Sequence, residues 1–270
     1  MAQAPEGTLY VGLRSDAESL DPHLVYHPSG FAVMEAIYDS LVIADWDGAI
    51  VPHLAASWSF PDDSTIEFVL RDDVTFHNGE RFNAESVKYS VERILDEALQ
   101  SGIASRFAVI ESVDVIDAQR VRLNLSRSDS SILWNLTGLA MLPPEYGARV
   151  TAAAFSRAPV GTGPFSFVEW VRDDHITVVA NPDYFSGGVK GQPGVAQVVF
   201  RILPEDAVRT AELRAGGVHL IEKLPVDLVG TVEAAGMIAV PADTGRFSVA
   251  WLVADGDGPL ADKRVRQALN

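Results

Sequence analysis

The sequence predicts an α/β fold that carries an inserted α+β subdomain. From residue 160 onward, apolar strand-like runs alternate with helical segments, which is typical of parallel strands joined by helices. Between residues 56 and 159, by contrast, short strand-like runs surround one long helical pattern. We therefore expect an α/β core from residues 1–55 and 160–270, with the α+β subdomain inserted at residues 56–159.

Composition and charge are those of an ordinary globular protein. The 270 residues are 47% hydrophobic and 21% charged, which is enough to build a sizeable core. The formal net charge of −16 opposes binding to nucleic acid phosphates and to anionic membrane surfaces, so both are poor partners. No apolar run reaches the roughly 18 residues of a membrane span, so we expect no direct membrane insertion. The lack of cysteine excludes disulfides, thiolate metal ligands and a cysteine nucleophile.

The first 55 residues predict a strand, a long loop, a short helix, and a second strand followed by a turn. The strand covers residues 8–14, and Pro and Gly residues prevent regular structure in the loop at residues 15–30. A helix at residues 31–38 is predicted because apolar side chains recur on one face: Phe31, Met34, Ile37 and Tyr38. A further strand then leads into a turn at Asp47-Gly48.

The middle of the chain holds the clearest helical signal. Residues 83–99 begin with Asn83, a good N-cap, and carry an apolar stripe formed by Val87, Val91, Ile94 and Leu95. Short strands at residues 57–60 and 65–71 precede it, and a hairpin turning at residues 117–119 follows. Residues 130–142 are predicted to be helical before two prolines break the pattern.

The last third of the chain predicts alternating strands and helices. Two strands, at residues 165–171 and 175–180, lead into a Gly/Pro-rich connection at residues 181–194. Strands then alternate with helices at these positions: strands at 196–203, 218–224, 237–242 and 246–254, and helices at 204–217 and 225–236.

Six stretches of this sequence, taken in their order and spacing, carry a resemblance to a known family. They are SLDPHL, the long run from AIYDSL to VERI (residues 36–94), PVGTGPFSFVEW, ANPDYF, AELRAGGVHLI and DKRVRQALN. Together they resemble the family 5 extracellular solute-binding proteins of ABC importers, which include peptide- and nickel-binding members. The resemblance covers residues 8 to 270, and the long run combined with PVGTGPF makes it specific.

The resemblance implies the first lobe of a type II periplasmic-binding-protein-like fold. Members of the family are roughly twice as long, and in them VRQALN leads across to a second lobe, which is absent here. The implied function is capture of an extracytoplasmic solute, with a short peptide preferred, and its delivery to ABC permease membrane subunits. A nickel chelate, a sugar or an opine stays open as the solute, as does a sensor or docking role on the same fold.

The implied location is the periplasm or another extracytoplasmic space. The residues AQAPEG near the start suit the positions just after an alanine-type signal cleavage site, so we expect the signal peptide to lie outside this sequence. A lipid anchor on the native precursor is an open alternative.

The loop before the first helix is the main candidate for ligand binding. It is long for a strand-to-helix connection, and its end carries small and aromatic residues: Tyr26, His27, Ser29, Gly30 and Phe31. Backbone N–H groups before a helix can face an anionic group, such as a peptide carboxylate. The alternative is a surface loop whose two aromatic side chains, Phe31 above all, are buried in the core.

The turn within PVGTGPF is the second candidate. Gly161 and Gly163 flank Thr162 and permit close approach of the backbone to a ligand, and the resemblance places this turn beside the cleft. The alternative is a rigid turn that only starts the next strand. Two tryptophans complete the candidate set: Trp251, at the end of a predicted strand, and Trp134, in the inserted subdomain.

Neither metal chemistry nor catalysis is predicted. His23 and His27 are four residues apart, but Pro22 and Pro28 oppose the helix that would bring their side chains together. A metal site therefore stays an alternative only because the family includes nickel-binding members. The sequence lacks the G-x-S-x-G, Walker A and H-E-x-x-H motifs. We therefore expect a binding protein without a cofactor, not an enzyme.

Overall fold

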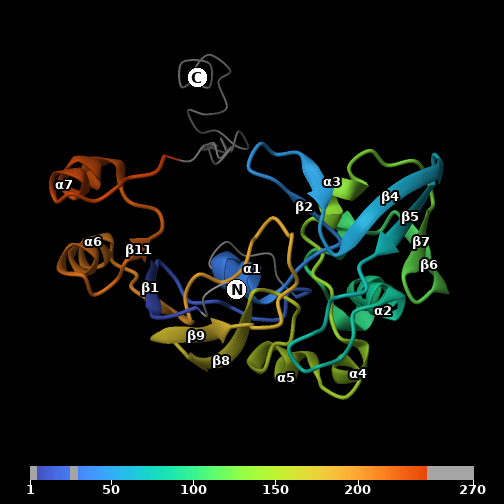
Figure 1. The fold of residues 1–270 in the computed structure, drawn as a ribbon, viewed down its shortest axis with the longest axis horizontal. Helices are drawn as coiled ribbons and strands as arrows, with labels where there is room; N and C mark the ends of the chain where they lie inside the picture. The colour runs from blue at the N-terminus through green and yellow to red at the C-terminus, as the bar shows by residue number, and fades with distance from the viewer. Residues whose placement is uncertain (1–4, 25–29, 242–270) are drawn as a thin grey trace, which may run out of the picture. The chain divides into compact units, whose positions relative to one another are not determined.

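The computed structural model describes residues 5–24 and 30–241, which form a mixed α/β fold (Figure 1). The chain divides into two compact units, of which the first ends at Val229 and the second begins at Gly230. The first unit contains all the described strands and the candidate site.

The first sheet has the strand order β11-β1-β10-β9-β8 in the described part of the chain. β1 is parallel to β10 and β11, whereas β9 is antiparallel to β10 and β8. Helix α6 (Asp206–Ala215) connects β10 to β11, which is the strand–helix–strand unit that the sequence predicts. The strands are β1 (Thr8–Leu13), β8 (Phe165–Val171), β9 (His175–Ala180), β10 (Gln197–Ile202) and β11 (Leu220–Ile221).

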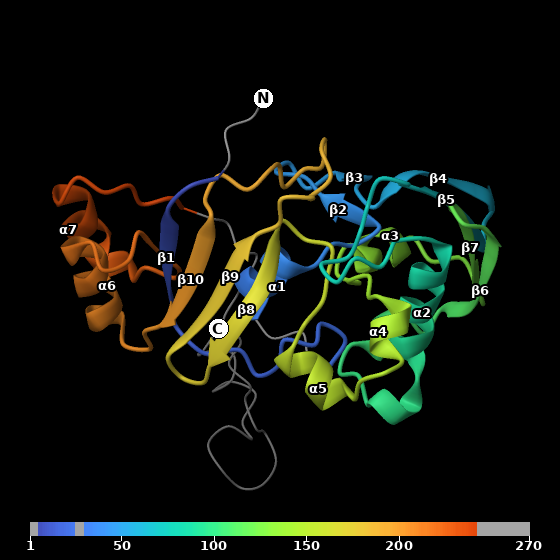
Figure 2. The same ribbon diagram turned by 60° about the horizontal axis from the view of Figure 1, so that its bottom comes forward.

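Two helices pack on this sheet. Helix α1 (Phe31–Ile37) lies against β8 and β9, as Figure 2 shows, and α6 packs on β1 and β11. Val33 and Ile37 of α1 are buried in a core that includes Phe200 from β10. Helix α6 ends at Gly216, whose φ of +78° places it in the left-handed conformation of a C-cap glycine.

The second sheet is antiparallel and has the described strand order β4-β5-β7-β6. Its strands are β4 (Ala55–Asp62), β5 (Thr65–Leu70), β6 (Ile110–Asp117) and β7 (Arg120–Leu125), and α2 (Ala84–Leu95) packs on β6 and β7. A small hairpin, β2 (Val42–Ala44) with β3 (Ile50–Pro52), precedes it, and its residue Val42 joins the same hydrophobic core as Phe68.

Helix α2 begins where the sequence predicts. The Asn83 side chain accepts hydrogen bonds from the backbone N–H groups of Glu85 and Ser86, and the Asn83 N–H donates in return to the Ser86 hydroxyl. The predicted stripe faces the core, since Val87, Val91 and Ile94 are all buried.

The prediction of a helix over residues 130–142 is largely wrong. Only α3 (Ile132–Leu136) is helical, because Ala140 forms an extended bridge with Ser40. Short helices then connect this segment to β8: α4 (Pro144–Gly147) and α5 (Ala152–Arg157). Two 3₁₀ turns follow α2, at Glu97–Leu99 and Ala104–Arg106.

The end of the described chain also differs from expectation. The predicted strand at residues 218–224 shortens to β11, and the predicted helix at 225–236 becomes a 3₁₀ turn (Val226–Leu228) followed by α7 (Val229–Ala234). Residues 237–241 form no strand; Ile238 and Val240 there are 87% and 83% exposed, so no neighbouring strand covers them. The predicted strand at 246–254 lies outside the described residues.

The proposed boundaries of the inserted subdomain remain a prediction. Each hydrophobic core draws residues from both sides of those boundaries: Leu41, Leu54 and Phe185 join the core of the second sheet, and Phe155 joins that of the first. We propose residues 56–159 as the insertion on the sequence pattern alone.

Candidate functional site

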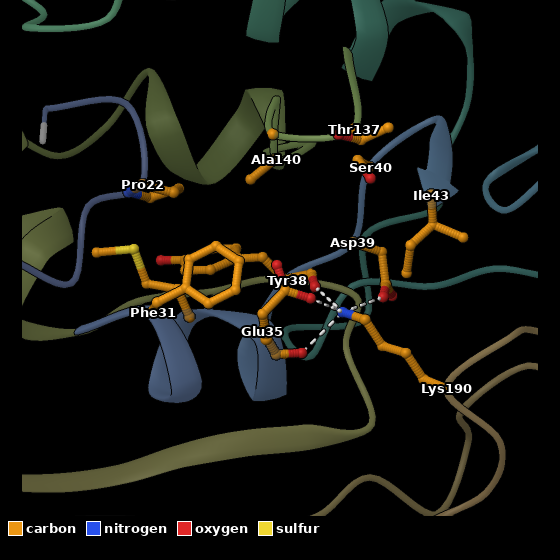
Figure 3. Close-up of a pocket in the computed structure, with 12 residues that line it drawn as sticks. Pro22, Phe31, Glu35, Tyr38, Asp39, Ser40, Ile43, Thr137, Ala140 and Lys190 are labelled. Carbon is orange, nitrogen blue, oxygen red and sulfur yellow. Dashed lines mark hydrogen bonds and ion pairs between the residues drawn. The ribbon is translucent and has the colours of Figure 1, made fainter. Parts of the chain in front are cut away.

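A pocket lies over α1, between this helix, the loop before it and the segment that follows α3 (Figure 3). It is open to solvent, and the space within it that a water-sized molecule can reach is about 60 Å³. Its apolar wall is formed mainly by Phe31, Met34 and Ile43. Such a mixture of apolar surface and a few polar groups is typical of small-molecule sites.

Asp39 is the fully buried anchor beneath this pocket. Its Oδ1 accepts hydrogen bonds from His53 Nε2 at 2.9 Å and from the Tyr184 hydroxyl at 3.4 Å, and its Oδ2 accepts one from the Thr162 hydroxyl at 3.0 Å. The Lys190 ammonium lies 3.0 Å from Oδ1. A buried carboxylate needs such partners to offset its lost hydration. Asp39 thus joins four segments that are far apart in sequence.

Lys190 links the Gly/Pro-rich connection at residues 181–194 to the end of α1 by hydrogen bonds. Its ammonium donates to the backbone carbonyls of Glu35 at 2.7 Å and Tyr38 at 2.6 Å, and it lies 3.4 Å from the Glu35 carboxylate (Figure 3). Because the last carbonyls of a helix carry partial negative charge, a cation is well placed there.

The Asp39–Lys190 pair stays charged at neutral pH. Burial alone raises the pKa of the Asp39 carboxyl, but the Lys190 charge and the His53 hydrogen bond outweigh burial and hold that pKa well below its usual range. Burial likewise lowers the pKa of Lys190, and the charges of Asp39 and Glu35 more than reverse this, so the pKa of the ammonium is raised.

The 161–163 turn supports Asp39 through the Thr162 hydroxyl. The Gly163 N–H donates to the Ile37 carbonyl at 2.9 Å, and a Cβ on Gly161 or Gly163 would collide with the Ile37 backbone. Thr162 is only 1% exposed. His77 clamps the turn, since its Nε2 donates to the Gly163 carbonyl at 2.9 Å. The three predicted turn residues therefore have packing roles, and their contact with a ligand stays a prediction.

The other predicted site residues fall into two groups. Phe31 is 45% exposed and lines the pocket, so the alternative that buries it in the core is wrong; Gly30 is the N-cap of α1 beside it. Trp134 is 55% exposed on α3, and its carbonyl accepts from the pocket-lining residue Thr137. The remaining candidates lie outside the described residues: Tyr26, His27, Ser29 and Trp251.

His23 has a structural role. It is buried, its Nε2 donates to the Ala140 carbonyl at 2.8 Å, and its neighbour Asp21 pairs with Arg93. Burial, followed by the Arg93 charge, lowers the pKa of His23 to about 4. Within the described ranges, no three acidic, histidine or cysteine side chains converge as metal ligands would. No helix in that part of the chain has both the length and the apolar character needed to cross a membrane.

Sequence reasoning missed the charged residues that organise the pocket: Glu35, Asp39 and Lys190. A signal for Asp39 was present, because it directly follows an apolar helical face and precedes the buried pair Leu41 and Val42. No comparable signal marked Lys190, a single cation in a connection rich in glycine and proline.

Comparisons with known proteins give this geometry a context. Residues 49–270 match the profile of the bacterial extracellular solute-binding proteins, family 5 Middle. A probable D,D-dipeptide-binding periplasmic protein of Escherichia coli (strain K12) is 27% identical to this chain, covering 100% of it and 53% of the relative. The chain therefore spans about half the length of such a relative.

Solved structures agree in fold. A periplasmic binding protein of Helicobacter pylori in complex with the peptide STSA has a TM-score of 0.77 and 29% identity, over 85% of this chain and 49% of the other. A protein of A. tumefaciens R10 in complex with agropinic acid has a TM-score of 0.79 and 32% identity, over 84% of this chain and 46% of the other. The predicted type II periplasmic-binding-protein-like lobe is thereby confirmed.

Proposed function

Since this chain belongs to the family 5 bacterial extracellular solute-binding proteins, we propose that it forms the first lobe of the solute-capturing component of an ABC importer. In this proposal the whole protein holds a short peptide between two lobes in the periplasm or another extracytoplasmic space. It then delivers the peptide to the membrane permease subunits. Capture is by lobe closure, without a chemical step.

The main support for the proposal is the pocket over α1, together with the ion pair that holds this helix in place. One wall of the pocket is formed by α1, and Asp39 and Lys190 fix the end of that helix to the rest of the lobe. Binding sites work best when a rigid scaffold holds them, because less conformational freedom is lost on binding. The open side of the pocket leaves room for a ligand that a second lobe would cover.

A non-peptide solute is the second candidate. The relative in complex with agropinic acid shares the fold at 32% identity, which is slightly more than the relative that holds a peptide. A sugar, an opine or a nickel chelate would use the same two-lobed closure. A sensor or docking role is a further alternative, and neighbouring permease and ATPase genes would favour import.

Native mass spectrometry of the full-length protein as purified, followed by release and identification of the bound solute, tests this function. A ladder of short peptide masses is expected, because main-chain recognition tolerates many side chains. A single non-peptide mass or a metal chelate would contradict peptide capture and show that the protein binds one dedicated solute. A preparation that carries no solute, and binds neither peptides nor opines when they are added, would contradict solute capture itself.

A further inference from the structure

The charges around the pocket do not balance. Among the described residues that line it, three carry a formal charge: Glu35, Asp39 and Lys190. The single ammonium lies 3.0 Å from an Asp39 oxygen and 3.4 Å from a Glu35 oxygen. Two carboxylates therefore share one cation, and this wall of the pocket carries a net charge of −1.

The carboxylate with the weaker share of this cation is that of Glu35. Asp39 is fully enclosed and receives hydrogen bonds from three side chains besides Lys190. An ammonium has three N–H donors, and the acceptors nearest to Lys190 are two backbone carbonyls and Asp39 Oδ1. The Glu35 carboxylate is the most distant of the four acceptors, and its side chain is 44% exposed.

Apolar surface adjoins this carboxylate on the same helix. Phe31 and Met34 precede Glu35 on α1 and line the same pocket, with Ile43 on the facing wall (Figure 3). An alkyl stem fits such surface, while a charged end stays near the solvent-exposed carboxylate. An anionic group in this position would be repelled by Glu35.

We propose that Glu35 is a specificity-determining residue and that the pocket accepts a ligand side chain with a positive charge on an apolar stem. This inference rests on the proposed capture of peptides. It names the class of peptide: one that carries a lysine- or arginine-like side chain at the position held by this lobe.

Isothermal titration calorimetry on the full-length protein tests the inference. The probes are trialanine, three tripeptides with one alanine replaced in turn by lysine, and three with the same alanine replaced by norleucine. Lysine and norleucine have similar stems and differ in charge, and the termini are identical. At one position we expect the lysine peptide to bind about fivefold more tightly, as a partly exposed ion pair permits. This preference should weaken as salt is added.

Two variants test whether Glu35 causes the preference for the lysine peptide. Glu35→Gln should abolish it. Glu111→Gln, which removes one exposed charge from β6 of the other sheet, should leave it intact. Equal binding of lysine and norleucine peptides at every position, or a preference that survives Glu35→Gln, overturns the inference. If none of the peptides binds, the proposed peptide function fails, and this inference fails with it.

Discussion

At the scale of single residues, the buried Asp39 carboxylate is held by four side chains. Its partners are enclosed with it, so removing its charge leaves the buried Lys190 ammonium with only the more distant Glu35 carboxylate as a counter-charge. We expect Asp39→Asn to lower the free energy of unfolding by about 3 kcal/mol, measured by urea denaturation at pH 7. Asp63→Asn, in the exposed turn between β4 and β5, is the matched control. Equal midpoints for both variants would contradict this role for Asp39.

The Asp39–Lys190 pair also predicts non-additive energies. Lys190→Met alone leaves the Asp39 carboxylate without its cation, whereas the double variant Asp39→Asn/Lys190→Met leaves no unpaired charge at the buried position. The double variant should therefore be more stable than the sum of the two single losses predicts, by about 1–3 kcal/mol. A double-mutant cycle from urea unfolding measures this difference. Strict additivity would show that the two side chains do not interact.

His23 predicts a dependence of stability on pH. Its folded-state pKa of about 4 lies below the ordinary value of 6.5, so the unfolded chain takes up a proton at a higher pH than the folded protein. The stability from keeping His23 neutral is complete above pH 6.5 and is lost progressively as the pH falls to 4, by about 3 kcal/mol in all.

His23→Gln isolates this contribution, because its amide can still donate to the Ala140 carbonyl and does not titrate. Unfolding free energies measured from pH 7.5 to pH 4 should fall less steeply in the variant than in the wild-type protein. The carboxylates common to both proteins cancel in the comparison. Parallel curves would mean that the pKa of His23 is the same in the folded and unfolded states.

At the scale of elements, the 161–163 turn needs glycine because its backbone lies so close to the end of α1. A Cβ at Gly161 would meet the backbone carbonyl of Ile37, which cannot move away as a flexible side chain can. Gly161→Ala should therefore cost about 2 kcal/mol of unfolding free energy. Gly194→Ala is the control, since no atom lies within 4 Å of the added methyl, and it should leave stability unchanged or slightly raised. Thermal and urea unfolding would both report the difference.

The same elements show which features could be predicted from sequence. Helix α2 was predictable because its cap, Asn83, and its apolar stripe are local signals. Residues 130–142 were not, since Ala140 leaves the helix to form a bridge with Ser40, a contact that only the tertiary fold creates. The pocket was only partly predictable for the same reason. Phe31 could be predicted because it lies at the end of a long loop, where a helix begins. Lys190 could not, because its partners lie more than a hundred residues away in the sequence.

At the scale of the whole molecule, the proposed function assigns this chain only part of the binding site. Small-molecule sites enclose most of the ligand surface, yet the pocket over α1 is open on one side. The chain spans 53% of the dipeptide-binding relative, and the proposed second lobe would supply the missing walls. Residues 1–270 alone should therefore bind the solute identified in the full-length protein more weakly than micromolar. Calorimetry on both proteins in one buffer makes the comparison, with circular dichroism to confirm that residues 1–270 are folded. Micromolar or tighter binding by residues 1–270 would mean that this lobe holds a complete site and that lobe closure serves release or delivery instead of capture.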